Sequence, residues 1–431
     1  MNCKLLPLLA FFMAAGCAAG QAKTSPLSAA GADSSGRPDG ILASILAPHA
    51  NQFDSLFRHN NQWKIQILYT QINRDRDNRP IFTSHAFNLD TASYFYPAST
   101  VKMPTAVLAL QRLNELNVRG LDRNTTMITE AGYPGLTAAV NDPSTPDGRP
   151  TIANYIRKIF LVSDNDAYNR LYEFLGQEYI NATLHRMGFR SAQILHRLEV
   201  SLTEDQNRHS NPIRFFDRYS REIYALPLRK SSLVYEQRNT RLGNGYWKGN
   251  TVVNEPFDFS KKNRLSLPDL HEMLTSIIFP EAVPAGRRFG LKAGDYEFLY
   301  KYMSMKPAES LYPSYDSTYN DSYVKFLLYG GSESMEGDSI RIFNKPGDAY
   351  GFLTDVAYVI DPSNGVEFLL SATIACNSDG IFNDSRYDYE TVGFPFLKNL
   401  GRAVYEYEVA RKKKRQPDLS KFKIIYTPNG E

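Results

Sequence analysis

The sequence has little net charge, no histidine pattern typical of a metal site and no internal repeat. Its 49 Lys and Arg residues and 46 Asp and Glu residues give a formal net charge of +3, which argues against a nucleic-acid partner. None of the seven histidines stands in a His-Glu-x-x-His or comparable ligand pattern, so no metal is expected. The remaining composition is that of an ordinary globular protein, and 431 residues allow two or three average domains or one large α/β unit with insertions.

Long hydrophobic runs are absent except at the start of the chain, where a lysine precedes an apolar stretch over residues 5–15. This stretch is too short to remain as a membrane span and predicts a cleaved export signal over residues 1–17. Small residues that lead into Cys17 resemble the lipobox of bacterial lipoproteins, with Ala14 where leucine is usual. The resemblance implies that Cys17 carries a lipid, and the polar residues 18–40 predict a flexible tether.

Cysteine is scarce, since the chain has only three and the first lies within the expected signal. After cleavage Cys17 and Cys376 remain, and Cys376 lies at the edge of an apolar run, so no internal disulfide is expected. The protein is therefore expected to be exported and held by its lipid at a bacterial membrane, facing the periplasm or the cell surface. An unmodified Cys17 is the alternative.

Apolar periodicity predicts one α/β domain over residues 41–412. Strand-like runs occur near both ends of this segment, and a helix over about 393–410 closes it. We therefore expect an antiparallel sheet that is built from both termini and flanked by helices, with an inserted all-helical lobe. The expected strands cover residues 63–69, 80–84, 351–360 and 366–374.

The domain is expected to divide into two lobes with one insertion. The α/β lobe covers about residues 41–95 and 340–412, and the helical lobe covers about 96–339. Aromatic and charged residues around a Gly-rich turn predict a β-rich insertion over 213–258 within the helical lobe. Residues 413–431 are expected to form a C-terminal tail.

Ser99 and Lys102 open an apolar run with helical spacing, which places the two side chains one turn apart on a single face. A serine hydroxyl is a weak nucleophile near neutral pH and needs a neighbour that accepts its proton. A lysine whose charged form is destabilised by burial or by nearby cations can share that work. Ser99 is therefore a candidate nucleophile, although Ser-x-x-Lys alone also occurs by chance.

Three further motifs follow along the chain. A Ser-Asp-Asn sequence at residues 163–165 begins a predicted helix, which its aspartate also suits as a cap. An Arg-Leu-Glu sequence at 197–199 places an acid beside a cation in a predicted loop. A Lys-Pro-Gly sequence at 345–347 runs into a predicted strand. A similar Lys-Ala-Gly sequence at 292–294 is followed by apolar residues with helical spacing. Because the Lys-x-Gly motif should begin a strand, we assign it to residues 345–347.

Ser-x-x-Lys, Ser-Asp-Asn and Lys-x-Gly in this order, with Arg-x-Glu between the second and third, resemble the class A serine β-lactamases and related penicillin-binding enzymes. The resemblance covers about residues 40–410. It implies a serine hydrolase that works through an acyl-enzyme and needs no cofactor. The implied catalytic residues are Ser99, Lys102, Ser163 and Glu199, and the implied substrate-binding residues are Asn165, Lys345, Gly347 and Asp348.

The resemblance also implies what each residue does. Ser163 passes a proton to the leaving nitrogen, and Asn165 donates a hydrogen bond to the substrate. The backbone N–H groups of Ser99 and Asp348 stabilise the oxyanion, and Lys345 provides positive potential for a substrate carboxylate. Which group deprotonates the nucleophile is disputed in the family.

Glu199 is implied to activate the water that hydrolyses the acyl-enzyme, with Arg197 holding its loop. The alternative is that Glu199 is a loop residue paired with Arg197. Two positions depart from the family pattern: Pro346 stands where Thr or Ser is usual, and Asp348 adds a negative charge nearby. Proline removes both a hydroxyl for the substrate carboxylate and a backbone donor, and Arg386 is a candidate replacement for that anchor.

Three functions remain open from the sequence. The first is the opening of β-lactam rings, which an acid in the position for deacylation favours. The second is a peptidoglycan DD-peptidase or amidase of the same fold, and the third is a tethered penicillin-binding module with little turnover. The complete set of Ser99, Lys102 and Ser163 argues against the third. The expected partner is a small-molecule β-lactam or peptidoglycan-like substrate, and the protein is expected to be a monomer.

Overall fold

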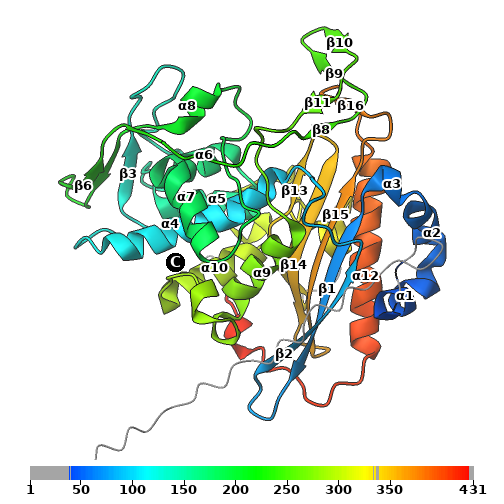
Figure 1. The fold of residues 1–431 in the computed structure, drawn as a ribbon. Coiled ribbons are helices and arrows are strands. Elements are labelled where there is room, and N and C mark those ends of the chain that lie inside the picture. The colour runs from blue at the N-terminus through cyan, green and yellow to red at the C-terminus, as the bar shows by residue number, and fades with distance from the viewer. Residues whose placement is uncertain (1–37, 39, 333, 336–338, 427–431) are drawn as a thin grey trace, which may run out of the picture.

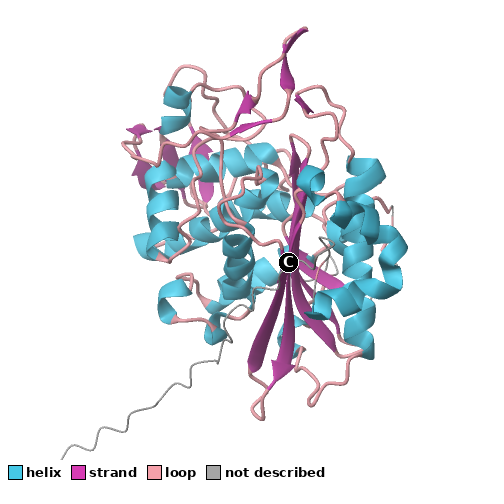
Figure 2. Cartoon of the chain, turned by 45° about the vertical axis from the view of Figure 1, so that its right-hand side comes forward, coloured by secondary structure: helices cyan, strands magenta, loops and turns pink. Residues whose placement is uncertain are grey.

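The computed structural model describes residues 38, 40–332, 334–335 and 339–426. The expected export signal and Cys17 lie outside the described residues, as does nearly all of the expected tether. Figure 1 shows a central sheet with helices on both sides, and Figure 2 shows the same layers after a turn of the view. None of the described helices combines the length and the apolar composition that a membrane crossing requires.

The central sheet is antiparallel and draws its strands from both ends of the chain, as the sequence predicts. Its order is β12-β14-β15-β1-β2, and a short strand, β13, also pairs with β14. The strands are β1 (Gln66–Arg74), β2 (Pro80–Phe87), β12 (Arg341–Asn344), β13 (Gly347–Ala349), β14 (Phe352–Asp361) and β15 (Val366–Ala375).

Both faces of the sheet are buried, because successive residues of its central strand belong to two different hydrophobic cores. In β14, Val356 and Tyr358 pack into one core, whereas Ala357 and Val359 pack into the other. On one face lie α1 (Gly40–Leu46), α2 (Ala50–Arg58) and α12 (Phe394–Ala410), and on the other lies α9 (Leu267–Ile278).

The helical lobe packs on the side of α9. Its central helix, α4 (Lys102–Leu116), contacts α5 (Ile152–Val162) and α6 (Asn165–Leu175). Helix α10 (Ala293–Ser304) packs against both α5 and β12. The remaining helices are shorter or more peripheral: α3 (Asn60–Trp63), α7 (Gln177–Arg186), α8 (Glu204–Arg208) and α11 (Phe326–Tyr329).

The expectation of an all-helical lobe needs a correction at β3, whereas β5 and β6 lie within the β-rich insertion that the sequence predicts over 213–258. A three-stranded sheet, β3-β5-β6, lies at the outer edge of the lobe (Figure 1). Residues alternate between buried and more exposed positions in β3 and β5, and this short period of two is the pattern of a strand with one covered face. Its strands are β3 (Thr126–Thr129), β5 (Ile213–Phe216) and β6 (Glu222–Leu226).

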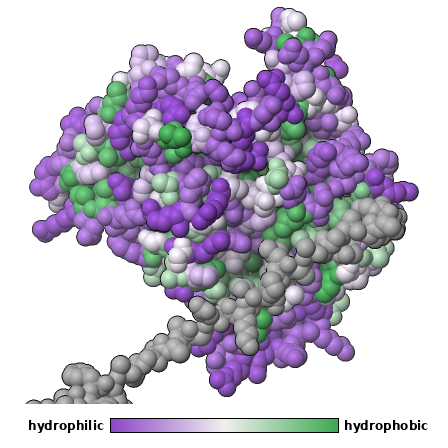
Figure 3. Space-filling view, in the orientation of Figure 1, coloured by the Kyte–Doolittle hydropathy of each residue, from purple (hydrophilic) through white to green (hydrophobic). Residues whose placement is uncertain are grey.

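Further short strands fill the segment between α7 and α9. They form small two- and three-stranded sheets, and the β9–β10 hairpin projects at the top of Figure 1. These strands are β4 (His209–Ser210), β7 (Arg229–Lys230), β8 (Arg241–Leu242), β9 (Gly245–Lys248), β10 (Thr251–Val253) and β11 (Phe257–Asp258). A strand from the segment after β15, β16 (Ile381–Phe382), pairs with β9. On the face seen in Figure 3, hydrophilic side chains dominate and hydrophobic ones form separate patches.

Candidate active site

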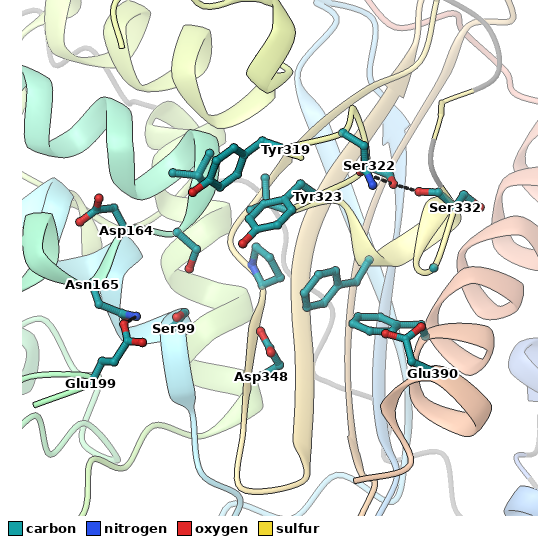
Figure 4. A pocket seen from close by; sticks show the side chains of 18 of the residues that line it. Ser99, Asp164, Asn165, Glu199, Tyr319, Ser322, Tyr323, Ser332, Asp348 and Glu390 are labelled. Carbon is teal, nitrogen blue, oxygen red and sulfur yellow. Dashed lines mark hydrogen bonds between the residues drawn. The ribbon is translucent and has the colours of Figure 1, made fainter. Parts of the chain in front are cut away.

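Ser99 lies on a sharp turn at the entrance of helix α4. The 3-10 helix η2 (Ala98–Val101) runs directly into α4, and Ala98 has a φ of 45°. A positive φ is uncommon for a residue other than glycine, and such conformations persist where the surrounding structure enforces them. Ser99 is half-buried and borders a cavity of about 880 Å³ (Figure 4).

Lys102 is fully buried beneath this turn and directs its ammonium group at the Ser-Asp-Asn segment. Lys102 Nζ donates to Ser163 O, to Ser163 Oγ at 3.1 Å and to Asn165 Oδ1 at 2.7 Å. These three acceptors match the three protons of an ammonium group. Among the described residues, Ser99 Oγ has no hydrogen-bond partner, and catalytic hydrogen bonds commonly tighten only when substrate binds.

Ser163 lies between two ammonium groups at the junction of α5 and α6. It ends α5 with a φ of 60°, and Asp164 caps α6 by accepting from the Ala167 backbone N–H at 2.7 Å. Ser163 Oγ accepts from Lys102 Nζ at 3.1 Å and from Lys345 Nζ at 2.9 Å. Because both lone pairs of the hydroxyl are occupied in this way, its single proton is left to donate elsewhere.

Lys345 lies between β12 and β13, whereas Lys292 immediately precedes helix α10. The strand context expected for the third motif is therefore found at Lys345. Side chains alternate along a strand, so Asn344 points to one side, where it donates to Asp355 Oδ1 at 2.9 Å. Lys345 points to the other side, towards Ser163.

Gly347 brings strand β13 against the turn that carries Ser99. A β-carbon added at this glycine would lie 2.7 Å from Ser99 N, 2.8 Å from Pro97 O and 2.8 Å from Thr100 N. Side-chain carbons do not approach backbone atoms that closely, so a larger residue would push the strand away from the turn. The backbone of β13 therefore lies beside the backbone of Ser99.

Burial weakens the charged form of both lysines. It lowers the pKa of Lys102 well below its ordinary value, and the charge of Lys345 adds to this effect. Burial also lowers the pKa of Lys345 to about 7, against the attraction of Asp348 and Asp355. Desolvation at the cavity raises the pKa of Asp348, which the two ammonium groups partly oppose. Burial thus favours the neutral form of both lysines beside Ser163, and a neutral amine can accept a proton.

Glu199 lines the cavity and is joined to the buried Lys102 by one side chain. Asn165 accepts from Lys102 through Oδ1 and donates from Nδ2 to Glu199 Oε2 at 2.5 Å. The carboxylate is exposed and the backbone of Glu199 has a φ of 58°. Its loop is fixed to helix α6, because the Asn169 side chain pairs with both the N–H and the C=O of Leu198.

Arg197 is not the partner of Glu199, which corrects the alternative reading of this loop. It is buried and forms an ion pair with Glu173 of helix α6, with an N–O distance of 2.9 Å. It also donates to the carbonyl groups of Gln206 and His209. The arginine therefore ties the two ends of the loop to each other and leaves the Glu199 carboxylate facing the cavity.

The two departures from the family pattern both border the cavity. Pro346 and Asp348 line it, so the third motif contributes no hydroxyl to the cavity. Arg386 lines neither this cavity nor the adjoining one of about 510 Å³, so the candidate anchor for a carboxylate is wrong. Among the described residues, no group of three or more His, Cys, Asp or Glu side chains is arranged to hold a metal ion.

Several residues of the site escape sequence reasoning. Tyr319, Tyr323 and Glu390 line the cavity but come from irregular or distant segments, and no motif marks them. Asn169 was detectable in principle, because it follows Asn165 by one helical turn and therefore shares its face of α6. Glu173 lies one further turn along the same face of α6.

Comparison with known proteins places the chain in a family. No curated protein matches the sequence. Among solved structures, the chain is similar to a class A β-lactamase from Clostridium kluyveri (13% identity, 84% of this chain and 98% of that chain, TM-score 0.47). It is also similar to a β-lactamase from Burkholderia phymatum (14%, 85% and 100%, 0.46) and to PBP-A (18%, 85% and 95%, 0.43). The model of the "Beta-lactamase enzyme family" matches residues 48–407, and the chain therefore belongs to the beta-lactamase enzyme family of serine hydrolases.

Proposed function

We propose that this protein opens β-lactam rings through an acyl-enzyme on Ser99. The observation that carries the proposal is the position of the Ser163 hydroxyl, which accepts from both Lys102 and Lys345 and borders the same cavity as Ser99. This arrangement offers a nucleophile, a proton acceptor and a route for the proton to the leaving group. Family membership supports the same class of reaction.

In the acylation step, Ser99 Oγ attacks the carbonyl carbon of the cyclic amide. Its proton passes to Lys102, whose lowered pKa makes the neutral amine accessible. The carbonyl oxygen gains negative charge, which the backbone N–H groups of Ser99 and Asp348 would stabilise. The C–N bond then breaks, and the leaving nitrogen receives a proton through the Ser163 hydroxyl.

In the deacylation step, Glu199 takes a proton from a water molecule. The resulting hydroxide attacks the ester carbonyl, the bond from carbon to Ser99 Oγ breaks, and the serine recovers its proton. Support for this role comes from the exposed Glu199 carboxylate and its link through Asn165 to Lys102. An enzyme without such a base would remain acylated and behave as a penicillin-binding protein.

A second candidate, a peptidase or amidase of the same fold, is favoured by one specific observation. Pro346 and Asp348 occupy the part of the cavity where a substrate carboxylate would be held. A natural amide that lacks a carboxylate at this point would not be affected by either residue. Both candidates use the same acyl-enzyme chemistry and differ in the leaving group.

The proposal is tested by labelling Ser99. A β-lactam or fluorophosphonate probe should add once to the wild-type protein, and intact-mass spectrometry should detect no adduct on Ser99→Ala. Ser363→Ala, in the turn between β14 and β15, is the matched control and should label normally. An unchanged adduct on Ser99→Ala would remove this serine from the mechanism, and absence of nitrocefin turnover by a labelled wild-type protein would favour the second candidate.

We also propose that a lipid on Cys17 anchors the protein to a bacterial membrane, on the basis of the sequence pattern at residues 14–17. The protein expressed in a bacterial host should fractionate with membranes, and Cys17→Ser should release it. A product that is soluble with its native cysteine would contradict the anchor.

A further inference from the structure

The cavity around Ser99 has acidic walls. Among the described residues that line it, five carry carboxylates and none is lysine, arginine or histidine. Figure 4 shows carboxylates on opposite sides of the opening, with Asp164 and Glu199 on one side and Glu390 on the other, and Asp348 between them. The five acidic residues are Asp164, Asp166, Glu199, Asp348 and Glu390.

Four of the five carboxylates form no ion pair among the described residues, although desolvation raises the pKa of Asp348 and so reduces its charge. Asp166 forms an ion pair with Arg170 at 2.8 Å, but Asp348 and Glu390 are exposed and form no ion pair among the described residues. Lys102 and Lys345 also lie close by, buried beneath the floor, and both attract Asp348. Burial lowers the pKa of both lysines, that of Lys345 to about 7, so they carry less than their full charge near neutral pH.

A second feature of the walls also suits a cation. The rings of Tyr315, Tyr319 and Tyr323 follow one another with centroid distances of 5.1 and 4.9 Å. Tyr319 and Tyr323 line the cavity and lie above Ser99 in Figure 4. Aromatic faces attract ammonium and guanidinium groups through the ring quadrupole. Carboxylates and tyrosine rings together therefore form a wall that favours positive charge.

The position of Ser163 identifies which part of a substrate meets this wall. Its hydroxyl is the proposed donor to the leaving nitrogen, so the leaving fragment must lie on the side of Ser163. Ser163, Tyr319 and Glu390 line the 880 Å³ cavity but not the adjoining one, which contains Lys262 and His196 instead. Glu199 and Asp348 border both cavities, whereas the remaining carboxylates and the tyrosine rings of the wall border only the one that contains Ser163 and therefore face the leaving fragment.

We infer that the cleft favours substrates whose leaving amine carries an additional positive charge over substrates in which that fragment carries a carboxylate. The inference rests on the proposed acyl-enzyme mechanism, because it assigns the leaving fragment by the proton route through Ser163. In the reaction, the C–N bond breaks, the acyl group stays on Ser99, and the leaving amine departs with its second ammonium group still beside the carboxylates. Pro346 removes the hydroxyl that would have held a carboxylate, which fits the same preference.

The test uses three thioesters with one N-acetylglycyl acyl group and different leaving thiols. Thiocholine provides a quaternary ammonium group that cannot take the acyl group from sulfur, 2-mercaptoethanol is neutral and mercaptoacetate provides a carboxylate. Release of each thiol is followed with a disulfide reagent, and each kcat/KM is divided by the uncatalysed hydrolysis rate of the same ester, because the thiols differ in intrinsic reactivity. At low salt we expect the cationic ester to exceed the anionic one by about 10–100-fold, with a smaller ratio in 0.5 M NaCl.

Matched variants test which residues cause the preference for the cationic substrate. Glu390→Gln removes one wall carboxylate and should reduce the ratio of cationic to anionic substrate by about 3–10-fold. Glu297→Gln, an exposed residue of α10 outside both cavities, should leave the ratio unchanged. Tyr319→Phe keeps the ring and should retain the preference, whereas Tyr319→Leu should weaken it.

The outcomes separate this inference from the proposed function. Hydrolysis that requires Ser99 but favours the anionic ester, or treats all three alike, would overturn the inference and leave the mechanism intact. An unchanged ratio in Glu390→Gln together with Tyr319→Leu would also overturn it. Hydrolysis that persists in Ser99→Ala would overturn both, whereas no hydrolysis of any ester by a protein that turns over nitrocefin would overturn the inference alone.

Discussion

Two polar networks lie on opposite sides of the segment around Asn344 and Lys345, and each contains a buried lysine. Lys325 donates to Ile342 O at 2.9 Å, to Met303 O at 2.7 Å and to Asn344 Oδ1 at 2.7 Å. Lys345 donates to Ser163 Oγ and to the carbonyl of Pro346, both at 2.9 Å. Burial lowers the pKa of each lysine to about 7.

The difference lies in where each network ends. Around Lys325 every partner is a buried acceptor, and Asn344 closes the network by donating to Asp355. Around Lys345 the network passes through Ser163 to Lys102 and through Asn165 to Glu199, which faces the cavity. The two lysines are equally buried and their pKa values are lowered equally, but their networks differ. The network of Lys325 is closed and holds the sheet, whereas the network of Lys345 is open to the cavity and can move protons. Burial of a lysine alone does not distinguish them.

The largest effect is expected at the exposed end of the open network. Glu199→Ala should still become acylated at Ser99 but should deacylate about 10²–10⁴-fold more slowly, because a positioned base contributes this much to proton transfer. A nitrocefin burst followed by intact-mass measurement over minutes would detect the accumulated acyl-enzyme. Glu204→Ala, which removes an exposed carboxylate from the neighbouring helix α8, is the control. Steady turnover equal to that of the wild type would exclude Glu199 as the deacylating base.

Breaking the closed network should cost stability rather than rate. Lys325→Met leaves three buried acceptors without their donor, and a loss of roughly 3–5 kcal/mol in the free energy of unfolding is expected. Lys345→Met is the matched variant of equal burial and should lose less stability but at least ~10-fold in kcat/KM. Urea unfolding and nitrocefin kinetics measure the two quantities. Equal destabilisation by both substitutions would end the distinction between the networks.

The lowered pKa of Lys325 also predicts how the free energy of unfolding changes with pH. The folded-state pKa of Lys325 is about 7, against an ordinary value of 10.5, so above pH 7 the unfolded chain holds a proton that the folded protein has released. The contribution of this lysine to the free energy of unfolding therefore rises with pH from about 7 towards 10. Lys325→Met should show a shallower rise when urea unfolding is compared at pH 7, 8 and 9.

The smallest effect is expected beside Lys345. Pro346→Thr would add a hydroxyl that can hold a substrate carboxylate, and one charge-assisted hydrogen bond is worth about 1.5–3 kcal/mol. Catalytic efficiency toward nitrocefin should therefore rise by at least ~10-fold, provided that the variant folds. Pro346→Val, of similar shape but without a hydroxyl, is the control, and an equal gain in both variants would show that the hydroxyl is not the cause.

Local patterns predicted much of this architecture because they depend on neighbours in the chain. Helical spacing gave the turn between Ser99 and Lys102, and strand-like runs gave β14 and β15. The Lys-x-Gly motif was assigned to Lys345 and not to Lys292 because a predicted strand follows Lys345, whereas the apolar residues after Lys292 have helical spacing. These features need no knowledge of distant contacts.

Features that depend on distant contacts were missed or mistaken. Arg197 pairs with Glu173, 24 positions earlier, and not with the acid two residues away, because the chain places the helix and not the neighbouring side chain beside the guanidinium. The tyrosine rings at 319 and 323 lie in irregular backbone without a periodic signal. Glu390 reaches the same cavity from the segment before α12, and only the folded sheet brings these segments together.

The pairing of β1 with β15 has a consequence for how the protein is made. Gln66 pairs with Thr373, so the first strand must wait for a partner about 300 residues later before the sheet can close. At about 5–20 residues per second of synthesis, that delay is roughly 15 to 60 s, and pairing at such separation is intrinsically slow. During this interval β1 can pair with β2, which follows it directly in the chain, but its other edge has no partner. The nascent chain thus presents a two-stranded hairpin with one open inner edge until β15 is made, and loss of the last quarter of the chain would leave that edge of β1 unpaired.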